Sequence, residues 1–166
     1  MRSAMLTAEY LRDLLKLNLT KPETYSIQNG LEWVTTEEVR IDINKYPHIF
    51  INPSSPSYEE WGVGSLNQLE QQQITIDIIS RGSDKIEFDS EKVDEYNFIL
   101  EGGVKYLRGN QVVDFIMNEV LDIIRHNHAS HISEGYHSVR PESATMQRLD
   151  NDIYHARVVI NAKIQQ

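Results

Sequence analysis

Cysteine is missing from this chain of 166 residues. Its absence excludes disulfide bonds, thiolate metal ligands and a cysteine nucleophile, and it is compatible with a reducing compartment. Long hydrophobic runs are missing too, since none approaches the roughly 20 residues of a membrane span. The opening residues MRSA are not followed by a long apolar stretch. We therefore expect neither a signal peptide nor a membrane partner.

A concentrated basic patch is also lacking, because the 16 Lys and Arg residues are dispersed and are outnumbered by 25 Asp and Glu. The resulting net charge of −9 repels nucleic-acid phosphates at long range. Modules that bind nucleic acids normally show clustered basic residues. We expect no specific nucleic-acid binding. A negatively charged surface could still line a channel through which DNA passes without being bound.

The overall composition is that of a globular protein, with 40% hydrophobic and 25% charged residues. A chain of this length buries roughly 70% of the surface that its unfolded form exposes, which is enough for a stable core without disulfide bonds or bound metals. No internal repeat or low-complexity linker divides it. We predict a single domain over residues 1–166, with a long loop at 52–67 and a possible insertion, hairpin or elbow at 101–110.

Helical periodicity predicts one helix over residues 4–17 and a long one after residue 110 that ends near His126. Ser90, as an N-cap, predicts a further helix that reaches Leu100. Alternating residues predict strands over 39–43, 48–51, 69–80 and 153–164. A short strand over 136–140 is expected to stop at Pro141, and Asn29–Gly30 could join two short strands.

The order of these elements predicts an α+β fold. Consecutive strands joined by short turns favour a mostly antiparallel sheet, here of four to five strands, with helices packed on one face.

Three histidines near the end of the long helix are the densest titratable cluster: His126, His128 and His131. If the chain curls there, they could bind a transition metal, as in a metal-dependent hydrolase or nuclease. Their spacings of two and three give no fixed i, i+4 pair. The simpler interpretation is that they cap the last carbonyls of the helix and complement its dipole.

Other catalytic patterns fail on context. Asp150, Asp152 and His155 are close in sequence, but the two aspartates are explained more simply as the turn before the last strand. The Gly62-Val63-Gly64 segment resembles the start of a dinucleotide-binding fingerprint, but it follows no strand and lacks a third glycine. There is no phosphate loop or G-x-S-x-G turn. We expect no enzymatic activity, no cofactor and no metal.

Two segments are predicted to contact partners. Tyr58 and Trp61 are aromatic residues in a polar loop, where they could anchor another protein or fold back over their own core. The polar end of the strand over 69–80 carries Gln71, Gln72 and Gln73, and we expect it to project from the sheet and be exposed.

The sequence resembles the tail terminator, or tail-completion, proteins of tailed phages and related archaeal viruses. The resemblance lies in the first amphipathic helix, the long helix and four strand segments: VRIDI at 39–43, YPHIFI at 46–51, QQITIDIIS at 72–80 and DIYHARVVI at 152–160. It covers most of the chain as a pattern of elements, without a specific motif. The loop at 52–67 and the stretch at 102–109 depart from it.

This resemblance implies a homo-oligomeric ring, commonly of six subunits. The ring would end the tail tube, join it to the head-completion or connector protein, and let double-stranded DNA pass. Such a protein is made in the host cytoplasm and resides in the virion. Three hypotheses are open. The first is this ring protein, or a neck or head-completion protein of similar build. The second is the metal-dependent hydrolase based on the histidine cluster, and the third is a small regulatory binding domain of the host.

Overall fold

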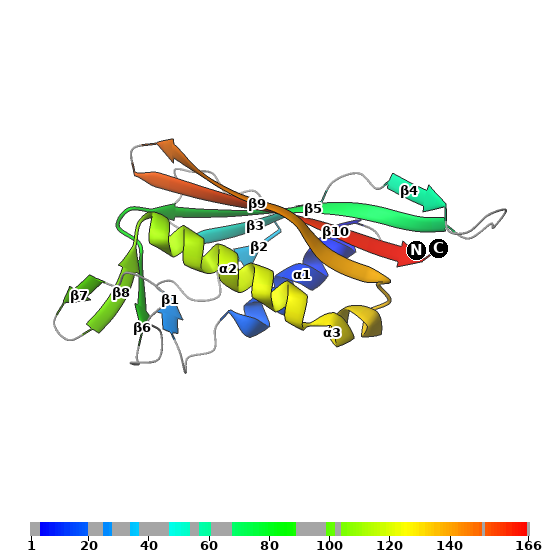
Figure 1. Ribbon diagram of the computed structural model, residues 1–166, viewed down its shortest axis with the longest axis horizontal. Helices are drawn as coiled ribbons and strands as arrows, with labels where there is room; N and C mark the ends of the chain where they lie inside the picture. The colour runs from blue at the N-terminus through cyan, green and yellow to red at the C-terminus, as the bar shows by residue number, and fades with distance from the viewer. Residues whose placement is uncertain are drawn as a thin grey trace.

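A computed structural model of the chain describes residues 4–19, 25–27, 34–36, 47–53, 57–60, 68–88, 99–101, 104–150 and 152–165. Three helices and ten strands form in these residues, which makes the fold α+β as predicted (Figure 1). None of the described helices is long and apolar enough to cross a membrane.

The main sheet has six strands. Across it lie β2 (Val34–Thr35), β3 (His48–Pro53), β5 (Gln68–Arg81), β10 (Ile153–Gln165) and β9 (Ser138–Asp150), and β4 (Ser57–Glu60) also pairs with β5. All pairs are antiparallel except β2 with β3. Because β10 pairs with β5 from Leu69 to Arg81, β4 lies on the other edge of β5, the edge that also carries β3.

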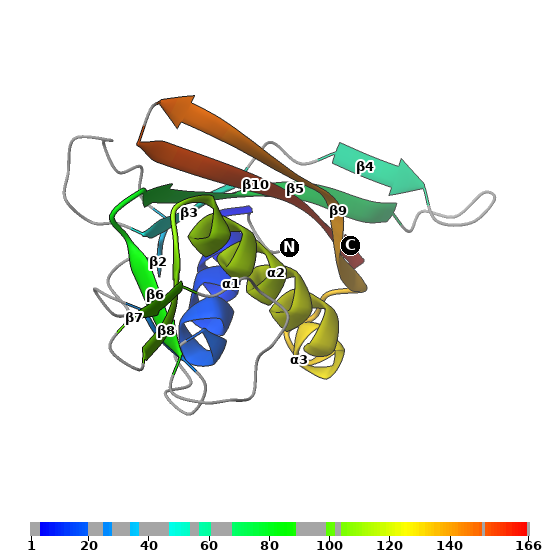
Figure 2. The same ribbon diagram turned by 60° about the vertical axis from the view of Figure 1, so that its left-hand side comes forward.

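Helices cover one face of this sheet. Figures 1 and 2 show α1 (Ala4–Asn18) and α2 (Asn110–His126) on the same side of the main sheet. The short α3 (His128–Ser133) follows directly after α2. Alternate residues of the two central strands point toward these helices and are buried. They are Ile74, Ile76 and Ile78 of β5 and Ala156, Val158, Ile160, Ala162 and Ile164 of β10.

A second, smaller sheet was not anticipated. Its order is β1 (Tyr25–Ile27), β6 (Lys85–Phe88), β8 (Val104–Arg108) and β7 (Ile99–Glu101), all antiparallel. Ile86 and Leu107 are fully buried and belong to the same core as the main sheet. Gly109 connects β8 to α2 with a φ of 62°, and a Cβ there would lie 3.5 Å from the Tyr154 ring. Glycine suits this turn because positive φ is costly for other residues.

Several predicted elements are confirmed. The helices at 4–17 and after residue 110 correspond to α1 and α2, and the strands at 48–51, 69–80 and 153–164 correspond to β3, β5 and β10. The insertion at 101–110 is mainly the β7–β8 hairpin. The strand predicted at 39–43 and the Asn29–Gly30 turn lie outside the described residues.

Three expectations were wrong. The strand predicted to stop at Pro141 continues to Asp150, because the register shifts beside Pro141 and Glu142 becomes an extra residue in an edge strand. Proline is tolerated at edges and bulges. The helix predicted to reach Leu100 is wrong at its end, where β7 forms. The loop at 52–67 contains β4, and its first two residues belong to β3.

Candidate functional site

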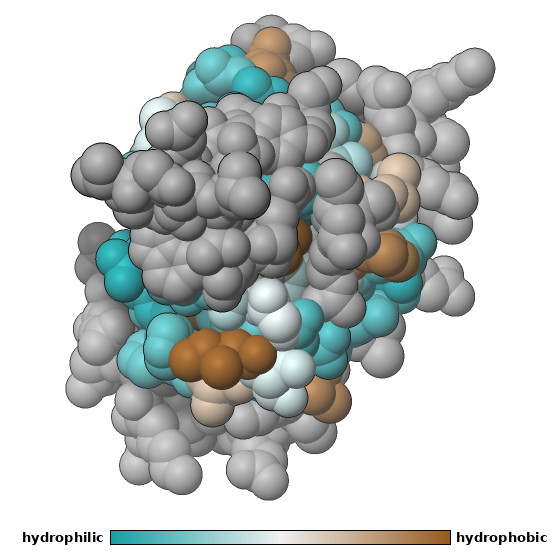
Figure 3. All heavy atoms as spheres, turned by 90° about the vertical axis from the view of Figure 1, so that its right-hand side faces the viewer, coloured by the Kyte–Doolittle hydropathy of each residue, from teal (hydrophilic) through white to brown (hydrophobic). Residues whose placement is uncertain are grey.

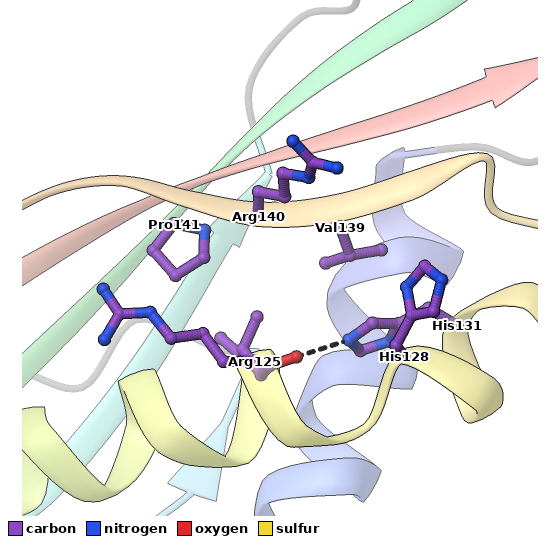
Figure 4. Close-up of a pocket in the computed structure, with 7 residues that line it drawn as sticks. Arg125, His128, His131, Val139, Arg140 and Pro141 are labelled. Carbon is purple, nitrogen blue, oxygen red and sulfur yellow. Dashed lines mark hydrogen bonds between the residues drawn. The ribbon is translucent and has the colours of Figure 1, made fainter.

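A groove lies where the first residues of β9 pass over the junction of α2 and α3 (Figure 4). Its volume is about 320 Å³. The residues that line it are Ile124, Arg125, His128, His131, Val139, Arg140 and Pro141. Ile124, Val139 and His131 are buried and form its floor, whereas Arg125 and His128 are exposed at its rim. The groove therefore combines a largely apolar floor with a guanidinium and an imidazole at its rim.

Three basic side chains around the groove have no hydrogen-bond or ion-pair partner within the described part of the chain. Arg125, His128 and Arg140 take part in no hydrogen bond or ion pair among these residues. Arg140 pairs in register with Asn161, on the face of the sheet opposite to the helices, and its side chain points away from α2 (Figure 4). The guanidinium groups of Arg125 and Arg140 are therefore available to an acidic partner, one on each face of β9.

The outer edge of the sheet lies beside this groove. Among the described strands β9 is outermost, with β10 as its only strand partner. All eight residues from 142 to 149 are exposed, so both faces of this part of β9 meet solvent. Met146 and Leu149 are 42% and 45% exposed. An edge strand of this kind presents backbone groups to which another strand can add.

The histidine cluster does not converge on one point. The ring of His131 is buried; its Nε2–H donates to the carbonyl of Ile124 at 2.7 Å, and the Tyr10 hydroxyl donates to its Nδ1 at 2.6 Å. Burial lowers the pKa of His131 below its ordinary value of 6.5. His126 donates to the carbonyl of Asp122 at 2.8 Å. The described residues contain no group of three metal-ligating side chains, and the capping interpretation fits His126 and His131.

The glutamine-rich end of β5 is only partly exposed. Gln73 is exposed and Gln71 is half-buried, but the expectation was wrong for Gln72, which is fully buried. The Thr7 hydroxyl donates to Gln72 Oε1, and the Tyr136 hydroxyl donates to Thr7 Oγ1 at 2.9 Å. This polar network joins α1 to the sheet, so Gln72 has a structural role in the chain itself.

The predicted aromatic contact residues are placed only in part. Tyr58 belongs to β4, where it pairs in register with Glu70, and Trp61 lies outside the described residues. The part of the predicted loop that contains Tyr58 is therefore a strand, which pairs with β5 on the side away from β10.

A buried carboxylate was missed by sequence reasoning. Asp77 Oδ1 accepts hydrogen bonds from His155 Nε2 at 2.7 Å and Arg157 Nε at 2.8 Å, and Gln147 Nε2 donates to His155 Nδ1 at 3.1 Å. Burial alone would raise the pKa of Asp77, but the two donors outweigh it, and its pKa lies below 3.8. His155 thus bonds to Asp77, not to Asp150 or Asp152, and the alternation of β5 gave no sign of this pairing.

A second groove, of about 390 Å³, lies between α1 and α3. Its lining includes the acidic residues Glu9, Asp13 and Glu134 and the exposed Leu6 and Leu17. On the end of the molecule shown in Figure 3, the coloured apolar side chains form separate patches among hydrophilic ones. The coloured surface in this view therefore shows no broad apolar face.

No protein-family model matches this chain, and no curated protein is detectably similar to it.

Proposed function

We propose that this protein is a structural, ring-forming component of a virion at the head–tail junction, where it ends the tail tube and joins it to the head connector. The observation that carries the proposal is the edge position of β9 among the described strands, together with the exposure of its residues 142–149 on both faces. Folded proteins usually protect such edges, because they invite association with other strands. A partner that covers the edge explains why it is retained.

A ring follows from contacts between unlike surfaces of identical subunits. Such head-to-tail contacts close into a ring when the rotation between neighbours permits it. Among the described strands, the main sheet has two different edges, one with β9 and one with β2 and β4. The net charge of −9 supports a bore through which double-stranded DNA passes without specific binding.

A catalytic function receives less support from the geometry. Both ring nitrogens of His131 are engaged within the fold, and Asp77 is held by His155 and Arg157 without a nucleophile among its bonded partners. We therefore do not propose the metal-dependent hydrolase.

The test is electron microscopy of virus particles made with and without the gene. Loss of the protein should leave filled heads and tails that are not joined, and antibody against the chain should label the head-proximal end of free tails. Label on isolated heads instead would favour a neck or head-completion protein. Normal particles without the chain would contradict the proposal.

A further inference from the structure

We propose that neighbouring copies in the ring meet through two grooves of opposite charge. The acidic groove of one copy, between α1 and α3, docks against the basic groove of the next, at the junction of α2, α3 and β9. Leu17 at the rim of the acidic groove enters the basic groove. This inference rests on the proposed self-assembly and names the surfaces that carry it.

The charges that line the two grooves are complementary. Glu9, Asp13 and Glu134 line the acidic groove, and no described Lys or Arg does. Arg125 and Arg140 line the basic groove, and no described Asp or Glu does. In a chain with a net charge of −9, a groove without carboxylates is an exception, and a second copy supplies the matching acidic surface. Complementary potentials of this kind steer association and disfavour incorrect partners.

The grooves open on different sides of α3. His128 and His131 line the basic groove, whereas Ser130 and the following Glu134 line the acidic one. Because an α-helix has about 3.6 residues per turn, these two pairs project from different faces of the helix. One copy can therefore contact one neighbour with its acidic groove and another with its basic groove. Contacts between unlike surfaces are head-to-tail, the kind that can close a ring.

Leu17 provides the apolar part of the contact. Its side chain lies at the acidic groove and is 75% exposed. Burial of an exposed leucine is favourable because it removes apolar surface from water. The floor of the basic groove is formed in part by the buried Ile124 and Val139, and its volume of about 320 Å³ has room for a leucine side chain.

The spacing of the charged groups matches that of the apolar groups. Asp13 precedes Leu17 by four residues, so the two side chains lie on the same face of α1, roughly 6 Å apart. Arg125 follows Ile124 directly, and Figure 4 shows its side chain beside the groove. When Leu17 packs on Ile124, Asp13 therefore comes within reach of Arg125. The ion pair that Asp13 makes with Arg12 is exposed, so its exchange costs little.

Residues 142–149 of β9 take no part in this contact. They follow Pro141, the last residue of β9 that lines the basic groove. They stay available to the tail tube or the connector, so the ring contact and the attachment of the ring use different surfaces.

Thiol-specific cross-linking tests the pairing directly, because the native chain has no cysteine. A chain with Leu17→Cys, mixed with a chain with His128→Cys, should give covalent dimers of one copy each when a short bismaleimide is added. Each chain alone should give none, because like residues are not opposed. The control mixture replaces the second chain by Thr145→Cys, an exposed residue farther along β9, and should give no dimer.

A chain that carries both Leu17→Cys and His128→Cys distinguishes the symmetry of the contact. A head-to-tail contact should give a ladder of covalent multimers, since every copy offers both surfaces to different neighbours. Products that stop at the dimer would show a two-fold contact and would overturn the head-to-tail interface.

Association constants from sedimentation provide an independent readout. Leu17→Ala should weaken association on the order of tenfold, because the neighbour no longer buries a leucine. The matched control is Leu149→Ala, which removes an exposed leucine from the outer part of β9 and should change association less than about threefold. The reverse order would assign the contact between copies to the outer part of β9.

Charge exchange tests the polar part of the contact. Asp13→Arg and Arg125→Asp should each weaken association on the order of tenfold, and the chain with both changes should recover part of the loss. The control Arg148→Asp makes the same change in net charge at an exposed site near the end of β9. It should leave association within about threefold of the native value.

The outcomes separate the two proposals. Multimers that form without these cross-links, and that tolerate Leu17→Ala and Arg125→Asp, would overturn this interface while leaving the ring intact. A chain that forms no multimer, alone or with tails, would overturn the ring and this interface together.

Discussion

The two faces of the main sheet differ in what stabilises them. The face toward α1 and α2 is mainly apolar, with Ile76 and Val158 fully buried between sheet and helices, although Gln72 is buried on it as well. The opposite face carries Asp77 bonded to His155 and Arg157 in the middle of the same two strands. Apolar burial is independent of charge, whereas the Asp77 cluster requires an ionised carboxylate. One pair of strands therefore combines a pH-independent contribution to stability with one that acid removes.

The largest expected effect comes from the helix-covered face. Ile76→Ala removes a fully buried side chain and should lower the free energy of unfolding by about 2–5 kcal/mol. The matched control is Thr75→Ala, because the adjacent residue faces the opposite side and is only partly buried. Denaturant titration of both variants measures the difference. Equal losses would show that the two faces are not distinct.

The next effect belongs to the opposite face. Asp77→Asn should cost about 1–3 kcal/mol at neutral pH, because the buried cluster loses its charged acceptor. Since the folded state lowers the pKa of Asp77, its contribution is complete above 3.8 and is lost as the pH falls through the folded-state pKa. Unfolding of the native chain and the variant should therefore converge in strong acid. A constant difference down to the lowest pH would contradict this account.

His131 lies on the helix side of the sheet, yet its contribution to stability depends on pH. Burial lowers the pKa of His131, so the unfolded chain binds a proton more readily and stability should fall as the pH drops below 6.5. His131→Gln should reduce this slope between neutral pH and pH 5, measured by denaturant unfolding. His126→Gln is the control, because that side chain is exposed. If both variants keep the native slope, another group is responsible.

The smallest effect is expected at the turn after β5. Burial raises the pKa of Asp84, and the carboxylate also accepts the backbone N–H of Arg81 at 2.6 Å. A raised folded-state pKa means that the contribution of Asp84 falls as the pH rises through it. Asp84→Asn keeps an acceptor and removes the charge, so it should raise thermal stability slightly at neutral pH, by less than about 1 kcal/mol. A clear loss of stability would show that the charge is needed.

The elements predicted correctly are those with long, regular patterns. β5, β10, α1 and α2 each span 13 to 17 residues, so their periodicity is unambiguous. The small sheet was missed because its strands have three to five residues. Runs this short carry little periodic signal, and β1 pairs with a strand about 60 residues later.

The candidate site was harder to predict than the fold. The part of β9 after Pro141 was not predicted, because a proline usually marks the end of a strand unless the strand is known to lie at a sheet edge. The groove unites Arg125 of α2 with Val139 of β9, and Asp77 meets partners 78 and 80 residues away. Such contacts depend on tertiary pairing, which local patterns do not encode.

Native mass measurement of the purified chain, alone and with isolated tails, tests the central proposal of ring assembly most directly. The proposal predicts one closed species at a fixed multiple of 19.2 kDa. A chain that remains monomeric under both conditions, or that grows into filaments of no fixed size, would contradict it.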